Sequence, residues 1–337
     1  MVSKRFVFKR LLMLFPVLFG VATVVFAILH LSPGDPAVVI AGERASQEFV
    51  DQVRSDLGLD DPLWQQYVRF LGEVATFDFG QSYQVNRGVP VSQILANRLP
   101  ITIELALLGQ FAGLLFGLPL GILSAVKQDT WTDHLTRIGA LSGISVPIYW
   151  SGPLLILLFA QFLGLLPTSG RIGSEFFVEP VTGLILVDTL LAGNVAAFRS
   201  AATHLFLPVV VLGIYQMALL SRMMRSSMVE VIRQDYMRTA RAKGQGSKIT
   251  VMKHGLRNAF IPVITVIGIQ FGSLLGGAVL TETVFEINGI GTLLVDAINR
   301  SDYPVVQGTV LVFAVLYTLV NLGVDLTYSV LDPRIEQ

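Results

Sequence analysis

The sequence predicts an all-α integral membrane protein with six transmembrane helices and a small helical cap on the outer face. Of its 337 residues, 53% are hydrophobic and 14% are charged, and the mean hydropathy is +0.65. Soluble globular domains carry about 25% charged residues. Six apolar runs are long enough to cross a ~30 Å hydrocarbon layer, which takes about 20 helical residues. The composition therefore excludes a soluble domain.

The six runs define the predicted spans in chain order: residues 11–31, 101–126, 138–166, 204–221, 259–281 and 304–324. The third run is long enough to tilt or to kink at Pro147 or Pro153. A seventh candidate, 181–197, contains Asp188. Because an Asp at mid-membrane costs about 2.5 to 3.5 kcal/mol, six spans are preferred over seven.

The distribution of Lys and Arg predicts the orientation. With the N-terminus inside, 16 of the 24 basic residues lie on the inner side, including nine from Arg222 to Arg257 and Arg334 near the end. The positive-inside rule then places both termini in the cytoplasm. The first run has 21 residues and no small-residue cleavage site follows it, whereas a secretory signal has an apolar region of about 7 to 15. We interpret it as an uncleaved anchor.

The outer segment before residue 101 is long enough to fold as a cap. Ser46 is predicted to begin a helix that ends at Gly58, and Asp61 is predicted to cap a second helix with Pro62 at its first position. Their predicted apolar stripes are Phe49, Val50, Val53 and Leu57, and Trp64, Tyr67, Val68 and Leu71. The cap either covers helix ends or docks an external partner. Residues 1–100 thus form an anchor and cap region, and 101–337 a transmembrane core.

Glycines recur at every fourth position in the second and fifth spans. They are Gly109, Gly113, Gly117 and Gly121, and Gly268, Gly272 and Gly276. Small residues at this spacing share one helix face and let two backbones approach closely. The pattern predicts close helix packing, either within the chain or against a second membrane subunit.

Recognisable catalytic and metal-binding patterns are missing from the sequence. There is no cysteine, and the four histidines are scattered, so the chain offers no disulfide, no thiolate and no metal cluster. Residues 243–248, KGQGSK, have the composition of a phosphate loop with the wrong spacing. Nucleophile elbows and zinc-binding helices are also missing. We therefore expect no catalytic residue, no metal site and no bound cofactor.

Polar residues at membrane depth are few: Glu104, Gln110, Gln216, Gln270, Asn321 and Asp325. Glu104 and Asp325 lie near span ends, where we expect headgroup water to reach them. The sequence therefore gives little support to a buried ion-coupling pair.

A cationic insert, residues 222–258, separates the fourth and fifth spans. Gln234 to Phe260 holds six basic residues and one acid. Apolar residues are predicted on one face of the helix that leads in (Met228, Val231, Ile232, Tyr236) and of the helix that leads out (Ile249, Met252, Leu256, Phe260). Between them we predict a short helix, Asp235 to Lys243, and a turn. Such a helix is marginal alone in water, so it is predicted to pack against something. Partner docking is preferred over a topology signal or a lipid contact.

Stretches along nearly the whole chain resemble one known family. The sequence is similar to the inner-membrane permeases of ATP-binding-cassette importers, in the dipeptide and oligopeptide family, and most nearly to the first permease subunits of dipeptide importers. The resemblance lies in LSPGDPAVVIAGERAS, LGLDDPLWQQYVRFLG, RLPITIELAL, LPTSGR, RSSMVEVIRQDYMRTARAKG, LRNAFIPVITVIG, LTETVFEINGIG, DYPVVQG and DPRI.

The resemblance implies a type I importer permease whose cytoplasmic helix docks in a groove of the ATPase. The family signature E-A-A-x-x-x-G, set on Gly244, falls on Arg238, Thr239 and Ala240 and lacks its Glu. The downstream I-x-L-P element falls on His254, Leu256 and Arg257 and lacks its proline. The implied coupling residues are Asp235, Tyr236, Arg238, Thr239, Ala240, Arg241, Lys243 and Gly244.

The resemblance also implies partners and a location. The implied partners are a second homologous permease, two ATPase subunits that use ATP and Mg, and an external, periplasmic substrate-binding protein. The implied location is the inner membrane of a bacterium. Membrane lipid is a further partner and nucleic acid is not. The implied cargo is peptide, with dipeptides first, although similar permeases carry glutathione, nickel chelates or oligosaccharides. Alternatives from other classes are a single-chain, ion-coupled secondary transporter and a scaffold subunit without a pore.

Overall fold

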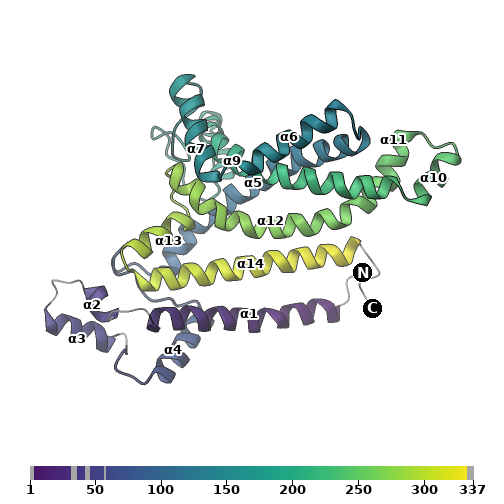
Figure 1. Ribbon diagram of the computed structural model, residues 1–337. Helices are drawn as coiled ribbons and strands as arrows, with labels where there is room; N and C mark the ends of the chain where they lie inside the picture. Colours follow the sequence, from purple (N-terminus) through teal and green to yellow (C-terminus); the bar gives the residue numbers. More distant parts are fainter. Residues whose placement is uncertain (1–3, 32–35, 42–45, 57, 332–337) are drawn as a thin grey trace.

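A computed structural model describes residues 4–31, 36–41, 46–56 and 58–331, and these residues fold almost entirely into helices. Long helices lie side by side across the molecule, with the first and last helices, α1 and α14, at one edge (Figure 1). The main core lies where α5, α9 and α12 meet. Outside the described residues lie the predicted stripe residue Leu57, the basic residue Arg334, part of the first family-like stretch and the whole of the last, DPRI.

Five helices are long and apolar enough to cross a membrane, and a bent pair makes up to six. The five are α1 (Lys4–Leu31), α5 (Val91–Val126), α9 (Val195–Ile232), α12 (Leu256–Val284) and α14 (Tyr303–Leu331). The prediction of six spans holds with the bent pair counted as one span.

The bent pair is the predicted third span. It consists of α6 (Trp131–Ser145) and α7 (Ile148–Leu155), which continues into the π-helical segment η1 (Ile156–Phe162), with a bend of 100° between the two parts. Val146 is extended there (φ −87°, ψ 118°), because a residue before proline avoids the helical region. The kink expected at Pro147 is therefore a complete break.

The helices extend well past the apolar runs that predicted them. Helix α9 has 38 residues, about 57 Å at 1.5 Å per residue, so its ends project beyond a ~30 Å hydrocarbon layer. Helix α5 likewise begins at Val91, before the predicted start at residue 101. Helix α9 therefore carries the chain from the end of the molecule opposite α10 directly into the cationic insert (Figure 1).

The candidate seventh span is not a span. Residues 181–197 hold only α8 (Ile185–Leu191), which has seven residues, and the start of α9. Asp188 is buried and accepts hydrogen bonds from the backbone of Thr182 (2.8 Å) and Gly183 (3.0 Å). Burial opposes its ionisation, but these hydrogen bonds prevail and hold the pKa of Asp188 below its ordinary value.

The outer segment forms three helices, one more than predicted: α2 (Pro36–Ala41), α3 (Gln47–Asp56) and α4 (Leu63–Thr76). Ser46 begins α3 as predicted, since its hydroxyl accepts from the Phe49 amide (3.3 Å). The predicted cap of α4 is wrong. Pro62 occupies the N-cap position, and Asp61 instead pairs with Arg69, two turns along the helix.

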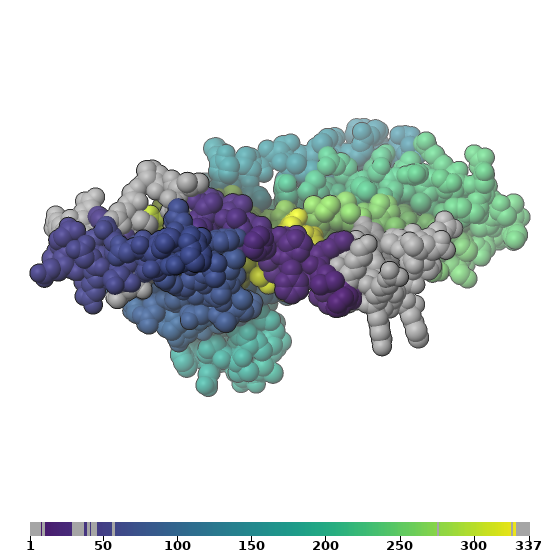
Figure 2. Space-filling view, turned by 90° about the horizontal axis from the view of Figure 1, so that it is seen from below, coloured from purple at the N-terminus to yellow at the C-terminus, as the bar shows by residue number. Residues whose placement is uncertain are grey.

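The predicted apolar stripe of α4 is also partly wrong. Trp64 and Val68 are exposed, whereas Phe70 is buried among residues of α1 and α14. The tyrosine hydroxyl of Tyr67 hydrogen bonds with Thr23 of α1 (2.6 Å). Helix α4 thus turns its inner face toward α1, and the cap lies at one end of α1 in the space-filling view (Figure 2).

The cap and the cationic insert lie at opposite ends of the molecule. The start of α1 and the end of α14 lie toward the end that carries α10 and α11, far from the cap (Figure 1). This arrangement agrees with the charge distribution, which predicts that the basic insert and both chain ends share one side.

Candidate functional site

The cationic insert forms the expected short helix. Helix α10 (Asp235–Ala242) follows Gln234, whose extended backbone (φ −68°, ψ 149°) separates it from α9. At its end, Gly244 has φ +82°, its amide donates to Arg241 O (3.0 Å), and the next amide donates to Ala240 O (3.2 Å). This pair of bonds is a Schellman motif, which requires a left-handed residue that glycine adopts without strain. The predicted boundary Asp235 to Lys243 is therefore correct to one residue.

The return path departs from prediction. It consists of α11 (Ser247–Ile249) and the π-helical segment η2 (Thr250–Gly255), which continues into α12. Ile249 and Met252, predicted to lie on the apolar face of the helix that leads out, are 57% and 50% exposed, whereas Val251 is buried. A π-helical turn bonds i to i+5 and changes the angular spacing of the residues. The apolar face that a 3.6-residue period predicts is therefore not the buried face here, and Tyr236, from the apolar face predicted for the helix that leads in, is also exposed.

A single buried side chain, Met237, packs α10 against η2, the segment that continues into α12. Met237 is fully buried. A Cβ on Gly255 would lie 3.3 Å from Met237 Cε and 3.6 Å from Met228 Cε, so the absence of a side chain at Gly255 makes the space that both methionines share. We call Met228, Met237 and Gly255 the methionine slot. Sequence reasoning missed it, although a lone methionine inside a charged helix was an available signal.

Two hydrogen bonds add to this attachment. Asn258 Nδ2 donates to the hydroxyl of Tyr236 (3.0 Å), and His254 Nε2 hydrogen bonds with Gln245 Oε1 (3.0 Å). Both join the α10 region to the η2–α12 arm. Helix α10 is thus connected covalently to α9 and by side-chain contacts to α12.

The opposite face of α10 is exposed and cationic. Of the predicted coupling residues, Ala240 is half-buried and the others are exposed: Asp235, Tyr236, Arg238, Thr239, Arg241, Lys243 and Gly244. Arg238 lies 3.8 Å from Asp235, but both side chains are more than 70% exposed, so solvent screens the pair. The other Lys and Arg residues of the insert after Gln234 are Arg241, Lys243, Lys248, Lys253 and Arg257. None of them forms an ion pair with a described residue. This surface can bind an acidic partner.

The glycines of α5 face α9 inside the same chain. A Cβ on any of them would lie less than 3 Å from an atom of α9: Gly109, Gly113, Gly117 and Gly121. Of the two interpretations left open by the sequence, close packing within the chain applies to this face. In α12, Gly268 and Gly272 face α14, whereas Gly276 has no atom within 4 Å of such a Cβ. The two patterns are alike in sequence but differ in their surroundings.

Three glutamines meet where α5, α9 and α12 cross. Gln216 Nε2 donates to Gln110 Oε1 (3.4 Å) and to the carbonyl of Gln270 (3.2 Å), and all three side chains are buried. Asn321 is half-buried, and the side chain of Asp325 lies outside the described residues. Within the described part of the chain, no group of His, Cys, Asp and Glu residues forms a metal site.

Glu104 does not contact headgroup water as expected. It is buried, pairs with Arg171 (2.6 Å) and accepts from the Leu186 amide (2.9 Å). The expectation failed because the loop after η1 folds back over the outer end of α5, and this contact is distant in sequence.

Sequence reasoning also missed further buried carboxylates: Asp133, Glu282 and Asp302. Asp133 of α6 accepts two hydrogen bonds from Arg225 of α9 (2.7 Å each) and one from Ser124 of α5. Near the outer end of α12, Glu282 accepts from the Thr102 hydroxyl (2.5 Å) and from the Thr292 amide (2.9 Å). The second carboxylate lies at the N-terminus of α13 (Ile290–Asn299), where a helix favours negative charge.

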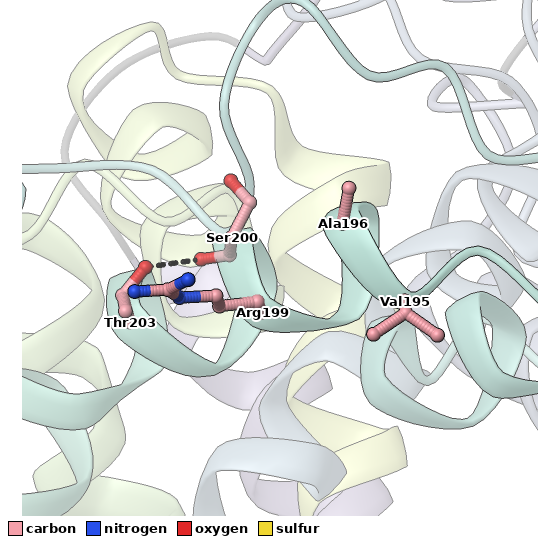
Figure 3. Close-up of a pocket in the computed structure, with 5 residues that line it drawn as sticks. All are labelled: Val195, Ala196, Arg199, Ser200 and Thr203. Carbon is pink, nitrogen blue, oxygen red and sulfur yellow. Dashed lines mark hydrogen bonds between the residues drawn. The ribbon is translucent and has the colours of Figure 1, made fainter.

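An open hollow lies at the N-terminal end of α9 (Figure 3). It has a volume of about 580 Å³ and is lined by Val195, Ala196, Arg199, Ser200 and Thr203. The Thr203 hydroxyl donates to the Ser200 carbonyl (2.8 Å). This hollow and α10 occupy opposite ends of the same long helix and its continuation.

Comparison with known proteins identifies two matching family models. Residues 117–337 match the model described as "Binding-protein-dependent transport system inner membrane component", and residues 3–106 match the corresponding N-terminal model.

Similar curated proteins cover nearly the full length. The dipeptide transport system permease protein DppB of Alkalihalophilus pseudofirmus is 45% identical over 97% of this chain and 98% of its own. DppB of Escherichia coli K12 is 44% identical over 98% of each. The glutathione transport system permease protein GsiC of Escherichia coli O1:K1 / APEC is 40% identical over 98% of each. Among solved structures, an inward-facing MetNI methionine ABC transporter chain has a TM-score of 0.54 at 17% identity and covers 71% of this chain and 97% of its own; this likeness concerns the fold.

Proposed function

The chain belongs to the family of binding-protein-dependent transport system inner membrane components, and on that premise we propose that it is the peptide permease subunit of an ATP-binding-cassette importer. It forms half of the translocation pathway, and a second, homologous permease forms the other half. Dipeptides are the proposed cargo, because relatives about 45% identical over nearly the whole length are named dipeptide transport permeases. Two ATPase subunits and an external binding protein complete the proposed complex.

The proposed role of this chain is mechanical. Helix α10 docks its exposed cationic face on an ATPase subunit, and ATP and Mg are used in that partner. The observation that carries this role is the attachment of α10: Met237 is buried in the methionine slot while the charged residues of the same helix are exposed. A displacement of α10 therefore acts on both α9 and α12, which is the connection that domain closure in a partner needs.

A charge-reversal pair tests docking in a reconstituted complex with both permeases, the ATPases and the binding protein. We expect Arg238→Glu with Arg241→Glu to lower dipeptide uptake and binding-protein-stimulated ATP hydrolysis at least tenfold, because like charges across an interface cost several kcal/mol. The matched control reverses Lys248 and Lys253, which are exposed in the same insert but lie outside α10. Equal effects of both pairs would show that net charge, not docking of α10, is responsible.

Two measurements separate the proposal from its alternatives. Dipeptide uptake by this chain alone, in vesicles without an ATPase, would support the single-chain secondary transporter. The second measurement is uptake of labelled dipeptide by the complete system in the presence of unlabelled glutathione or unlabelled dipeptide. It distinguishes two cargo classes, because the relative at 45% identity is named a dipeptide permease and the one at 40% a glutathione permease. We expect dipeptide, and not glutathione, to compete.

A further inference from the structure

A second cationic feature lies within the helical bundle, between α6 and α9. A pocket of about 300 Å³ is lined there by residues of α5, α6 and α9, among them Thr136, Arg137, Leu141, Ile144, Arg222 and Arg225. We call it the inner pocket. It is separate from α10 and from the hollow of Figure 3, since it shares no lining residue with either.

Two of the three arginines in the inner pocket have no ion-pair partner among the described residues. Asp133 neutralises Arg225 through two hydrogen bonds of 2.7 Å. Arg137 and Arg222 form no hydrogen bond or ion pair with any described residue, and both are exposed. The pocket therefore presents two guanidinium groups to a ligand, and a guanidinium suits the bidentate binding of phosphate or carboxylate.

The sequence places both arginines at the ends of apolar runs. Arg137 directly precedes the run 138–166, and Arg222 directly follows the run 204–221. Both ends lie on the side of α10, because α6 begins and α9 continues toward that side (Figure 1). Charged residues at the ends of such runs lie at the level of lipid headgroups.

Apolar side chains of α6 lie beside the two guanidinium groups. Along α6, Trp131, Leu135, Ile138 and Leu141 are all exposed, at the three- and four-residue spacing of one helix face. Leu141 and Ile144 extend this apolar surface into the pocket. The pocket thus joins an apolar surface to arginines and to the hydroxyl side chains of Ser124, Thr136, Ser221 and Ser226. A phospholipid offers both an apolar chain and an anionic phosphate that these groups can bind.

We propose that the inner pocket binds the phosphate of an anionic phospholipid from the leaflet on the α10 side, with its acyl chain along α6. Basic pockets between transmembrane helices on the cytoplasmic side bind such headgroups. With about 1 kcal/mol per Arg near the membrane surface, loss of both charges corresponds to an affinity about 30-fold lower. The inference concerns lipid binding and does not depend on the cargo.

The test measures phosphatidylglycerol bound to the complete, purified complex by native mass spectrometry. We expect Arg137→Gln with Arg222→Gln to reduce retained phosphatidylglycerol several-fold, and the corresponding Lys substitutions to keep most of it. The matched control, Arg87→Gln with Arg300→Gln, removes two exposed charges near the opposite side and should keep the wild-type amount. Equal retention by all variants would overturn the proposal.

Thermal melting in nanodiscs identifies the source of the phosphate. We expect phosphatidylglycerol mixed into phosphatidylcholine to raise the melting temperature of the wild type, and not of the double Gln variant. The same rise from inorganic phosphate in phosphatidylcholine alone would assign the pocket to a free anion. Arginine-dependent labelling of α6 and α9 by a photoreactive dipeptide would assign it to cargo, and either result overturns the lipid proposal.

Discussion

Truncation of Met237 should detach α10 from the bundle without unfolding the membrane spans. The side chain is fully buried in the methionine slot, and Met→Ala at a buried site costs about 2 to 5 kcal/mol. The two hydrogen bonds that remain, from Asn258 and His254, contribute about 1 kcal/mol each. Helix α10 has eight residues, too few to be stable alone in water. The loss therefore matches or exceeds the remaining attachment.

Hydrogen–deuterium exchange and uptake measure this effect together. In the reconstituted complex, we expect Met237→Ala to increase exchange at the amides of α10 and to lower dipeptide uptake at least tenfold, while the amides of α5 and α9 keep their protection. Met252→Ala is the matched control, because Met252 lies in the same insert and is half exposed. We expect it to have little effect on either measurement.

The reciprocal change, Gly255→Ala, should be milder. Its Cβ would lie 3.3 Å from the Met237 methyl group, which is the flexible end of an adaptable side chain and can move by a few tenths of an ångström. Wild-type exchange and uptake in Met237→Ala would refute the slot as the attachment of α10.

Three further predictions follow from other sites. Gly244→Val places a branched residue at φ +82°, where a left-handed backbone costs about 1 to 2 kcal/mol. We expect the end of α10 to fray and its amides to exchange hydrogen for deuterium faster; unchanged exchange would contradict this prediction. A Cβ at Gly113 would lie 2.4 Å from an α9 side chain, whereas one at Gly276 meets nothing within 4 Å. Overpacking costs about 1 to 3 kcal/mol of stability, so Gly113→Leu should lower the melting temperature and Gly276→Leu should not. Because the chain lacks cysteine, Ser55→Cys should react with an impermeant thiol reagent from outside and Ser247→Cys only from inside; the reverse would refute the proposed orientation.

The short-range features of the site could be predicted from sequence because local rules determine them. Gly244 ends α10 through hydrogen bonds between residues close in sequence, and the charged residues of this short helix are exposed. The burial of Met237 had a signal in the sequence, but its packing beside Gly255 could not be predicted, since the π-helical segment that ends at Gly255 changes which residues face inward. No sequence period signals that turn.

Contacts between residues far apart in the sequence also could not be predicted. Spacing alone showed that the glycines of α5 share a face, but only the folded chain shows that α9 lies against it. Likewise, Glu104 and Glu282 could be recognised as carboxylates near apolar runs, but their partners Arg171 and Thr102 are far away in sequence. Each case depends on tertiary packing that a single sequence does not encode locally.

Substitutions in the close contact between α5 and α9, which we call the seam, can test the transmission of movement from α10 separately from the docking of α10. Because a Cβ added to any of the four glycines of α5 would lie less than 3 Å from α9, the two backbones pack closely, and under the proposed role we expect a displacement of α10 to move them together. Glu282 further ties the outer end of α12 to α5 through Thr102. Gly113→Leu should therefore keep the exchange protection of α10 and still lose uptake, whereas Met237→Ala should lose both. If Gly113→Leu lost the protection of α10 as well, the seam and the docking helix would form one cooperative unit, and transmission could not be assigned to the seam alone.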